Sequence, residues 1–257
     1  MVAVAIVTPA YDGRVHDDHA RSIANGRAAL AKAGITSTRI CISGDAVLPR
    51  VRNQCVAQAL LTGAERIVMI DSDIGFDAEM LVRLVSHDVD IVGAAPQAQL
   101  KSWRDAASPH CVWRPFGGES QIDARGLVIA QGLATGFLCV RRNVFAELIK
   151  QGHARRYIYP GIDPKAWTHL ATYFDYELAP ADLENDPILA AQCDAHGIAH
   201  EDAVIWEGED YYLCKRARES GFDCFLDVGL AVRHWEGRSV HDFSLMESMQ
   251  AMQQAAE

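Results

Sequence analysis

A short apolar run that ends in two acids constrains the fold of this chain more than any other feature. Four apolar residues follow Arg66, and the run leads directly into Asp71, Ser72 and Asp73. An unbroken apolar run rich in β-branched residues is typical of a strand buried on both faces. Open α/β sheets bind ligands at the carboxyl ends of such strands. We therefore expect Asp71 and Asp73 to emerge at that edge, with Ser72 pointing the other way.

The two carboxylates predict a cation between them. Acids this close, and partly removed from water, repel each other unless a cation or a proton lies between them. The pair therefore indicates a divalent-metal site that also holds phosphate oxygens. The alternative is that both acids cap the next helix, because Asp77 and Glu79 follow. The preceding apolar run favours the metal.

Composition bounds the class of protein. The chain has 257 residues, of which 49% are hydrophobic and 23% charged, as in ordinary globular proteins. Its formal net charge of −10 argues against a broad electrostatic grip on nucleic acid, but it leaves room for a local basic groove. Seven scattered cysteines without a CxxC motif favour reduced, buried thiols over a disulfide framework or a zinc site.

The location expected from the sequence is cytoplasmic. The amino-terminal apolar run lacks a basic lead and stops at Pro9, so it predicts a first strand and not a signal peptide. No apolar stretch approaches the length that spans a membrane. The oligomeric state is left open.

The first part of the chain alternates between strands and helices, which predicts a parallel, doubly wound half that binds a mononucleotide. The expected strands cover residues 2–7, 36–42, 66–70 and 88–94, and the expected helices cover 16–33, 48–61 and 77–87.

The second part is less regular. Its expected strands cover 126–130, 136–140, 222–227 and 230–234, and its expected helices cover 142–150 and 209–221. Residues 152–202 are rich in aromatics and proline without clear periodicity, so we expect an irregular segment that covers a substrate. A short helix is expected beyond Phe243.

Three groups of side chains have chemistry that suits a site. Arg50 and Arg52 open a helix, where backbone N–H groups and the helix dipole favour a bound anion. Glu209 and Asp210 occupy another first helical turn, where an ionised acid can take a proton from a hydroxyl or hydrogen-bond a sugar, although ordinary capping is the alternative. His234 ends an apolar strand, where a lone histidine is usually structural.

Together these segments resemble a glycosyltransferase of the GT-A fold. The matching segments, in chain order, are Thr8-Pro9-Ala10-Tyr11, Arg52-Asn53, Asp71-Ser72-Asp73, Thr135-Gly136-Phe137, Gly208-Glu209-Asp210-Tyr211 and Arg233-His234-Trp235. The closest likeness is to small stand-alone enzymes of bacteria and phages, and the stretch from Arg52 to Pro96 also resembles fungal Golgi mannosyltransferases. A single DxD motif is weak evidence, whereas the ordered set covers nearly the whole chain.

The resemblance implies one GT-A (Rossmann-like) domain over residues 1–257, with a mixed, mostly parallel sheet flanked by helices. Residues 1–96 would bind the nucleotide and residues 97–257 the acceptor. It also implies a nucleotide-sugar donor, most often a UDP-sugar, together with Mn²⁺ or Mg²⁺. Hard cations with oxygen ligands and phosphates suit this assignment better than zinc does.

The resemblance further implies a role for each matching residue. The implied metal ligands are Asp71, Asp73 and His234. The implied donor contacts are Thr8, Ala10, Tyr11 and Asp12 at the base and ribose, Asp71 at the ribose or metal, and Arg52 near the diphosphate. Glu209 or Asp210 would face the acceptor, with Asp210 preferred as general base, and Gly136, Trp206 and Trp235 would contact the acceptor or the sugar. Inversion by direct displacement is favoured, with retention left open.

Other functions stay open at this point. The acceptor can be a glycan or, as in some phages, a hydroxymethylated pyrimidine in DNA, for which a basic rim is available from Arg141, Arg142, Arg155, Arg156 and Lys165. A nucleotide-sugar-binding module without catalysis is a second alternative. A haloacid-dehalogenase-like phosphatase is disfavoured, because its DxD follows the first strand and continues with Gly-Thr or a similar pair.

Overall fold

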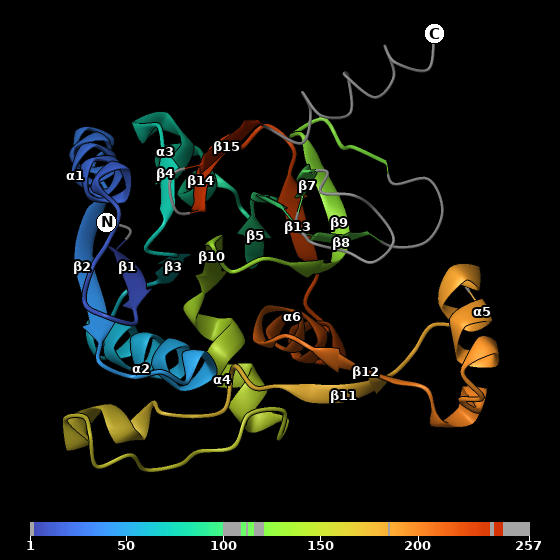
Figure 1. Cartoon of the computed structure of the whole chain (residues 1–257). Helices are drawn as coiled ribbons and strands as arrows, with labels where there is room; N and C mark the ends of the chain where they lie inside the picture. Colours follow the sequence, from blue (N-terminus) through green and yellow to red (C-terminus); the bar gives the residue numbers. More distant parts are fainter. Residues whose placement is uncertain are drawn as a thin grey trace, which may run out of the picture.

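A central mixed β-sheet with helices on both faces organises the chain (Figure 1). The computed structural model describes residues 3–99, 109–111, 113–115, 121–184, 186–236 and 239–243. The order of strands across the sheet is β2 (Thr36–Ser43), β1 (Ala3–Ala10), β3 (Arg66–Ile70), β10 (Phe137–Arg141), β5 (Ile91–Gly93), β13 (Cys224–Asp227), β9 (Leu127–Leu133) and β8 (Trp113–Pro115).

Most strands of this sheet run in the same direction. Strand β10 is antiparallel to both β3 and β5, and β9 is antiparallel to both β13 and β8. The remaining neighbours, β2–β1, β1–β3 and β5–β13, are parallel. The expected α/β architecture with a mixed, mostly parallel sheet is therefore confirmed.

The sheet differs from the expected parallel half in one respect. Strand β10 comes from the second part of the chain, yet it lies between β3 and β5 and separates them. Its residues Phe137, Leu138, Cys139 and Val140 are fully buried, because they face helices on both sides of the sheet. The two parts of the chain thus share one sheet.

Alternation along the buried strands divides the core into two layers. On β1, Ala5 and Val7 pack into one layer, whereas Val4 and Ile6 pack into the other. The first layer is covered by α2 (Leu48–Leu61), α4 (Arg142–Lys150) and α6 (Glu209–Glu219), and the second by α1 (Asp17–Lys32) and α3 (Ala78–Ser86). All five residues of β3 are buried, as its apolar run predicts.

A small second sheet follows the acid pair directly, and sequence patterns did not reveal it. It has the order β15 (Ser239–Phe243), β14 (Val232–Glu236) and β4 (Ile74–Phe76). Strand β4 is only three residues long and starts immediately after Asp73. Its presence separates Asp71 and Asp73 from α3, so the two acids do not cap that helix.

The segment 152–202 contains more regular structure than expected. It includes the 3₁₀ turns η1 (Pro164–Thr168) and η2 (His200–Asp202), strand β11 (Glu177–Pro180) and helix α5 (Pro187–Ala195). Strand β11 pairs with β12 (Val204–Glu207), and Figure 1 shows this ribbon and α5 extending from the body of the molecule. Asp186 caps α5 and Pro187 starts it, which is a helix-start pattern that could have been recognised.

Strands β6 (Gln97–Gln99) and β7 (Pro109–Cys111) pair with each other. The helix expected beyond Phe243 lies outside the described residues. Within the described part of the chain, no helix has the length and apolar character needed to cross a membrane, and the six cysteines assigned there are free thiols, of which all but Cys41 are buried.

Candidate functional site

A groove of about 270 Å³ opens at the carboxyl ends of β1 and β3. Its lining includes four of the predicted site residues, namely Tyr11, Arg52, Asp71 and Asp73. Ser72 also borders the groove, although we expected it to point away. Tyr11 lies on the rim with 70% of its surface exposed, which suits a ring that stacks on a flat ligand. We call this feature the β1–β3 groove.

Arg52 joins the two acid motifs of the chain. It lies near the start of α2 and is only 4% exposed. Its terminal nitrogens donate to Oδ1 and Oδ2 of Asp71 at 2.9 and 3.2 Å, and its Nε donates to Oε1 of Glu209 at 3.1 Å. Burial opposes the charge of Arg52, but attraction by Asp71 and Glu209 prevails and raises its pKa. The guanidinium therefore ties the end of β3 to the start of α6.

Neither predicted anion-binding arginine has a guanidinium without a partner. Arg50 donates to both carboxylate oxygens of Asp45, at 2.6 and 2.7 Å, and this contact is the main cause of the lowered pKa of Asp45. Arg52 is occupied by Asp71 and Glu209. A diphosphate in the groove would meet Arg52 only by competing with these carboxylates.

Asp73 and His234 face each other at the end of the groove. The distance from Asp73 Oδ2 to His234 Nε2 is 3.5 Å. Burial would raise the pKa of Asp73, but the hydrogen bond and charge of His234 prevail and lower it. Strand β14 brings the histidine here, because His234 pairs with Ile74 and the amide of Trp235 donates to the Asp73 carbonyl at 3.0 Å.

The Asp73–His234 pair fits a divalent cation. Two ligand atoms 3.5 Å apart can both lie about 2.1 Å from one ion, which is the usual Mg²⁺–oxygen distance. Among the described residues, no group of three or more His, Cys, Asp or Glu side chains gathers closely enough to hold a metal by itself. Asp71 is directed to Arg52 instead. Such a site would thus rely on phosphate or water oxygens, as Mg²⁺ sites commonly do.

The residues on either side of His234 hold its strand against α1. Arg233 Nε and Trp235 Nε1 both donate to Oδ2 of Asp18, at 2.8 and 3.0 Å, and the Trp235 ring stacks on His16 at 4.2 Å. Burial opposes ionisation of Asp18, but these donors lower its pKa to about 2. Since alternate strand residues point to opposite faces, this clamp fixes His234 on the side of Asp73.

Gly75 is required for this clamp. A Cβ built at Gly75 would lie 1.9 Å from Oδ2 of Asp18, so no other residue fits without displacing the carboxylate. The contact links β4, which follows the acid motif, to α1 and β14. The described contacts of Trp235 are therefore structural, and its predicted place at a sugar remains a prediction.

Other predicted donor contacts lie around the base of the groove. Thr8 and Ala10 are fully buried in β1, and Thr8 Oγ1 lies 3.3 Å from Nε2 of the buried His19. His19 uses its Nδ1 to contact the Ile74 carbonyl at 3.1 Å. Asp12 is exposed and accepts from the amide of Arg14 at 3.0 Å. Of the four predicted contacts in this segment, Tyr11 lines the groove, together with its neighbour Pro9.

Glu209 and Asp210 have different surroundings although they are adjacent. Glu209 is 8% exposed and is paired with Arg52. Asp210 receives a hydrogen bond from the amide of Tyr211 at 3.1 Å but makes no ion pair among the described residues. Burial, followed by repulsion from Glu209, raises the pKa of Asp210 to about 6, against the opposing effect of Arg52. A carboxylate that titrates near neutrality is suited to proton transfer.

The predicted sugar contacts lie in two places. An added Cβ at Gly136 would lie 3.4 Å from Oδ2 of Asp71, and the Gly136 carbonyl accepts from the Asp71 amide at 3.1 Å. Trp206 is 68% exposed on β12, with Tyr176 at a ring distance of 5.2 Å. Burial, followed by the charge of Glu209, raises the pKa of Tyr176, so the Tyr176 ring lies near the acid pair.

Asn53 has a role that sequence reasoning did not identify. Its amide donates to the Phe174 carbonyl at 3.0 Å and its Oδ1 accepts from the Phe174 amide at 2.9 Å. This two-way bond fixes the segment before β11 against α2, beside Arg52. The feature of the sequence that could have identified Asn53 is its position, as a polar residue next to a predicted anion-binding arginine.

Comparisons with known proteins give distant likenesses only. No protein-family model and no curated protein sequence matches the chain. Among solved structures, A197 from STIV is 13% identical with a TM-score of 0.46, covering 96% of this chain and 91% of its own. A glycosyltransferase involved in the glycosylation of the major capsid of PBCV-1 is 12% identical with a TM-score of 0.32, covering 62% and 70%. Both TM-scores are too low to support an argument about function.

Proposed function

We propose that the protein is a metal-dependent glycosyltransferase of the GT-A type, which moves a sugar from a nucleotide-sugar to a hydroxyl of an acceptor. The observation that supports it most is the pairing of two complementary sites through Arg52. On one side lies Asp73 with His234, and on the other lies Asp210 with its pKa raised to about 6. Arg52 contacts Asp71 on the first side and Glu209 on the second.

Each part of this arrangement has a role in the proposed reaction. The base and ribose would lie in the β1–β3 groove against Tyr11, with a UDP-sugar as the first donor to test. Asp73 and His234 would hold Mn²⁺ or Mg²⁺, which would stabilise the negative charge of the departing diphosphate. The Arg52 guanidinium adds a fixed positive charge behind Asp71.

The proposed chemistry is a single displacement. Asp210 takes the proton of the acceptor hydroxyl as the oxygen of that hydroxyl bonds to the anomeric carbon. The bond from the anomeric carbon to the diphosphate oxygen breaks, and its electron pair leaves with the nucleoside diphosphate. Glu209 is not the preferred base, because its carboxylate is already paired with Arg52. Attack opposite the leaving group inverts the anomeric centre.

A donor screen tests the proposal. Nucleotide-sugars are incubated with the protein and Mn²⁺, and the free nucleoside diphosphate is measured, since slow hydrolysis identifies a donor without an acceptor. We expect release from one class of donor, and its loss in Asp73→Ala. The exposed Asp194→Ala serves as control, with a side chain that is 71% exposed. Binding of a donor without any release would instead indicate a binding module, and no binding to any donor would refute the proposal.

A further inference from the structure

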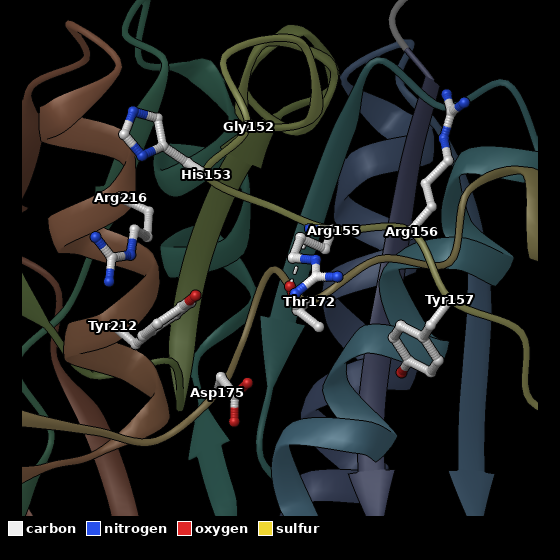
Figure 2. Close-up of a pocket in the computed structure, with 9 residues that line it drawn as sticks. All are labelled: Gly152, His153, Arg155, Arg156, Tyr157, Thr172, Asp175, Tyr212 and Arg216. Carbon is white, nitrogen blue, oxygen red and sulfur yellow. Dashed lines mark hydrogen bonds between the residues drawn. The ribbon is translucent and has the colours of Figure 1, made fainter.

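A second cavity, of about 550 Å³, lies alongside α6 (Figure 2). Three parts of the chain line it: residues 152–157, which follow α4, residues 172–175, and helix α6. The residues that determine its chemistry are Arg155, Arg156, Asp175, Tyr212 and Arg216. None of them belongs to the site described above. We call this feature the arginine cavity.

Two of its three arginines have guanidinium groups without a partner in the described part of the chain. Arg216 donates to Glu177 at 2.5 Å and to Glu219 at 2.7 Å, so its charge is compensated. The guanidiniums of Arg155 and Arg156 make no hydrogen bond or ion pair with any residue that the structure describes. Among the lining residues Asp175 is the one carboxylate. In Figure 2 the Arg155 side chain lies among the lining residues, whereas the Arg156 side chain extends away from them at the rim. The cavity therefore presents the charge of Arg155, with Arg156 at its edge, and no described residue neutralises either guanidinium.

The backbone that bears these two arginines is fixed. The amide of Arg155 donates to Thr172 Oγ1 at 3.0 Å, and its carbonyl accepts from the Thr172 amide at 3.0 Å. Arg156 forms a β-bridge with Ala171. The positive charges thus stand on an ordered segment, which reduces the entropy that binding a ligand would cost.

The charge at this place contrasts with that of the chain. Residues 141–172 contain six Lys and Arg against two Asp and Glu, in a protein whose formal net charge is −10. Charge on Arg142 and Arg156 also adds to burial in lowering the pKa of His169. A local positive region in an acidic protein favours an anionic ligand over a merely solvated surface.

Helix α6 connects the cavity to the acid pair. Glu209, Tyr212 and Arg216 follow one another at spacings of three and four residues, so they lie along one stripe of the helix. Seven residues of helix span about 10 Å. An anionic group beside Arg216 would therefore lie about 10 Å along the helix from Glu209, the residue that precedes Asp210.

We propose that the arginine cavity holds the anionic group, a phosphate or carboxylate, of a small acceptor molecule whose hydroxyl reaches Asp210. This inference rests on the proposed function and names the acceptor class for the same site. The volume is in the range of small-molecule sites. A long nucleic acid would meet the acidic remainder of the protein, which disfavours it relative to a compact anion.

Residue-resolved arginine labelling tests the site without any transfer reaction. The full-length protein is labelled with phenylglyoxal at constant ionic strength, and each arginine-containing peptide is quantified by mass spectrometry. Saturating inorganic phosphate is expected to slow labelling of Arg155 about tenfold and that of Arg156, at the rim, by less, since a charge-assisted hydrogen bond occupies the guanidinium. Arg27 and Arg39 are expected to label at unchanged rates. Acetate in a parallel arm distinguishes carboxylate from phosphate as the preferred group.

Several outcomes overturn the assignment. Equal labelling of Arg155 and Arg156 with and without either anion refutes the site, and protection by duplex DNA alone refutes the small-molecule acceptor. The double variant Arg155→Gln/Arg156→Gln is expected to lose phosphate binding yet keep donor hydrolysis. The control variant Lys32→Gln/Arg39→Gln removes the same amount of charge and is expected to keep both. If the folded double variant also loses donor hydrolysis, the cavity belongs to the donor site. Protection of the arginines in a protein that cleaves no donor would leave the site standing while the proposed function fails.

Discussion

At the scale of single residues, the difference between Glu209 and Asp210 decides which acid accepts a proton. The two are neighbours in the same helical turn, so sequence reasoning could not separate them. The structure separates them through Arg52, which contacts Glu209 and leaves Asp210 half-buried without an ion pair in the described part of the chain. An acid whose pKa approaches the working pH is the better base.

The pH dependence of the reaction follows from this assignment. With the pKa of Asp210 at about 6, the rate should be constant above pH 7 and fall tenfold per pH unit well below pH 6, because the protonated acid cannot accept a proton. Asp210→Asn is expected to slow transfer or donor hydrolysis by about 10²- to 10⁴-fold. Initial rates from pH 4.5 to 9 check both statements. A profile without an acidic limb near 6 would assign the base elsewhere.

The same raised pKa has a consequence for stability with a definite sign. Below the ordinary value of 3.8 the acid is protonated in both folded and unfolded protein and costs nothing. Between 3.8 and about 6 the unfolded chain ionises first, so the folded state loses stability as pH rises, and above 6 the full cost is present. Asp210→Asn should therefore raise or maintain Tm at pH 7, which separates lost chemistry from lost folding.

Arg52 is expected to be essential for stability, whereas the neighbouring Arg50 is not. Arg52→Gln leaves Asp71 and Glu209 facing each other without their shared cation, which should lower the free energy of unfolding by about 3–5 kcal/mol. Arg50→Gln removes a partly exposed pair with Asp45 and should cost about 1 kcal/mol or less. Urea unfolding of both variants checks the contrast. Equal losses in the free energy of unfolding would show that the buried contacts of Arg52 with Asp71 and Glu209 stabilise the fold no more than the Arg50–Asp45 pair does.

At the scale of elements, the placement of β14 against α1 and β4 determines whether a metal pair exists. Asp18 and Arg233 are 215 residues apart in the chain, and Arg52 and Glu209 are 157 apart. No local periodicity reports contacts of this range. The acid pair after β3 could be predicted because its strand is a continuous apolar run, but the clamp that aims His234 could not.

Gly75 offers a test of that clamp. Gly75→Ala places a Cβ on the Asp18 carboxylate, so it should cost about 1–3 kcal/mol of stability, as overpacking does, and weaken divalent-metal binding. Asp18→Ala removes the obstacle and the clamp together. In that background, adding Gly75→Ala should cost little further, which a double-mutant cycle by urea unfolding measures. Additive effects of the two substitutions would contradict the proposed contact.

At the scale of the whole molecule, the strand order explains what sequence reasoning could and could not predict. Apart from the short strand β4, the strands and helices of residues 3–93 occur where hydrophobic patterns place them. The insertion of β10 between β3 and β5 was not foreseen, because pairing of distant strands leaves no mark on either strand. That insertion brings Gly136 to Asp71 and so joins the two parts of the site.

The distribution of charge belongs to the same scale. Residues 177–207 contain eight Asp and Glu and no Lys or Arg, whereas residues 141–172 carry an excess of positive charge. Anions should therefore be attracted to one side of the molecule and repelled from the ribbon of β11 and β12. This asymmetry accounts for a local anion site in a protein whose composition argues against a broad grip on nucleic acid.

The central claim is that Asp73 and Asp210 serve one reaction from two sides, one through a metal and a diphosphate and the other through a proton. Calorimetric titration of the nucleoside diphosphate from the donor screen, with Mn²⁺, into wild type, Asp73→Ala and Asp210→Asn tests it most directly. We predict that Asp73→Ala weakens nucleotide binding by at least about a hundredfold. Removing a residue that only supports a metal ligand lowers affinity by up to about a hundredfold, and loss of a ligand itself should cost at least as much. Asp210→Asn is predicted to bind as wild type does while its turnover is lost. Equal binding by all three proteins, or loss of binding in Asp210→Asn alone, would contradict the account.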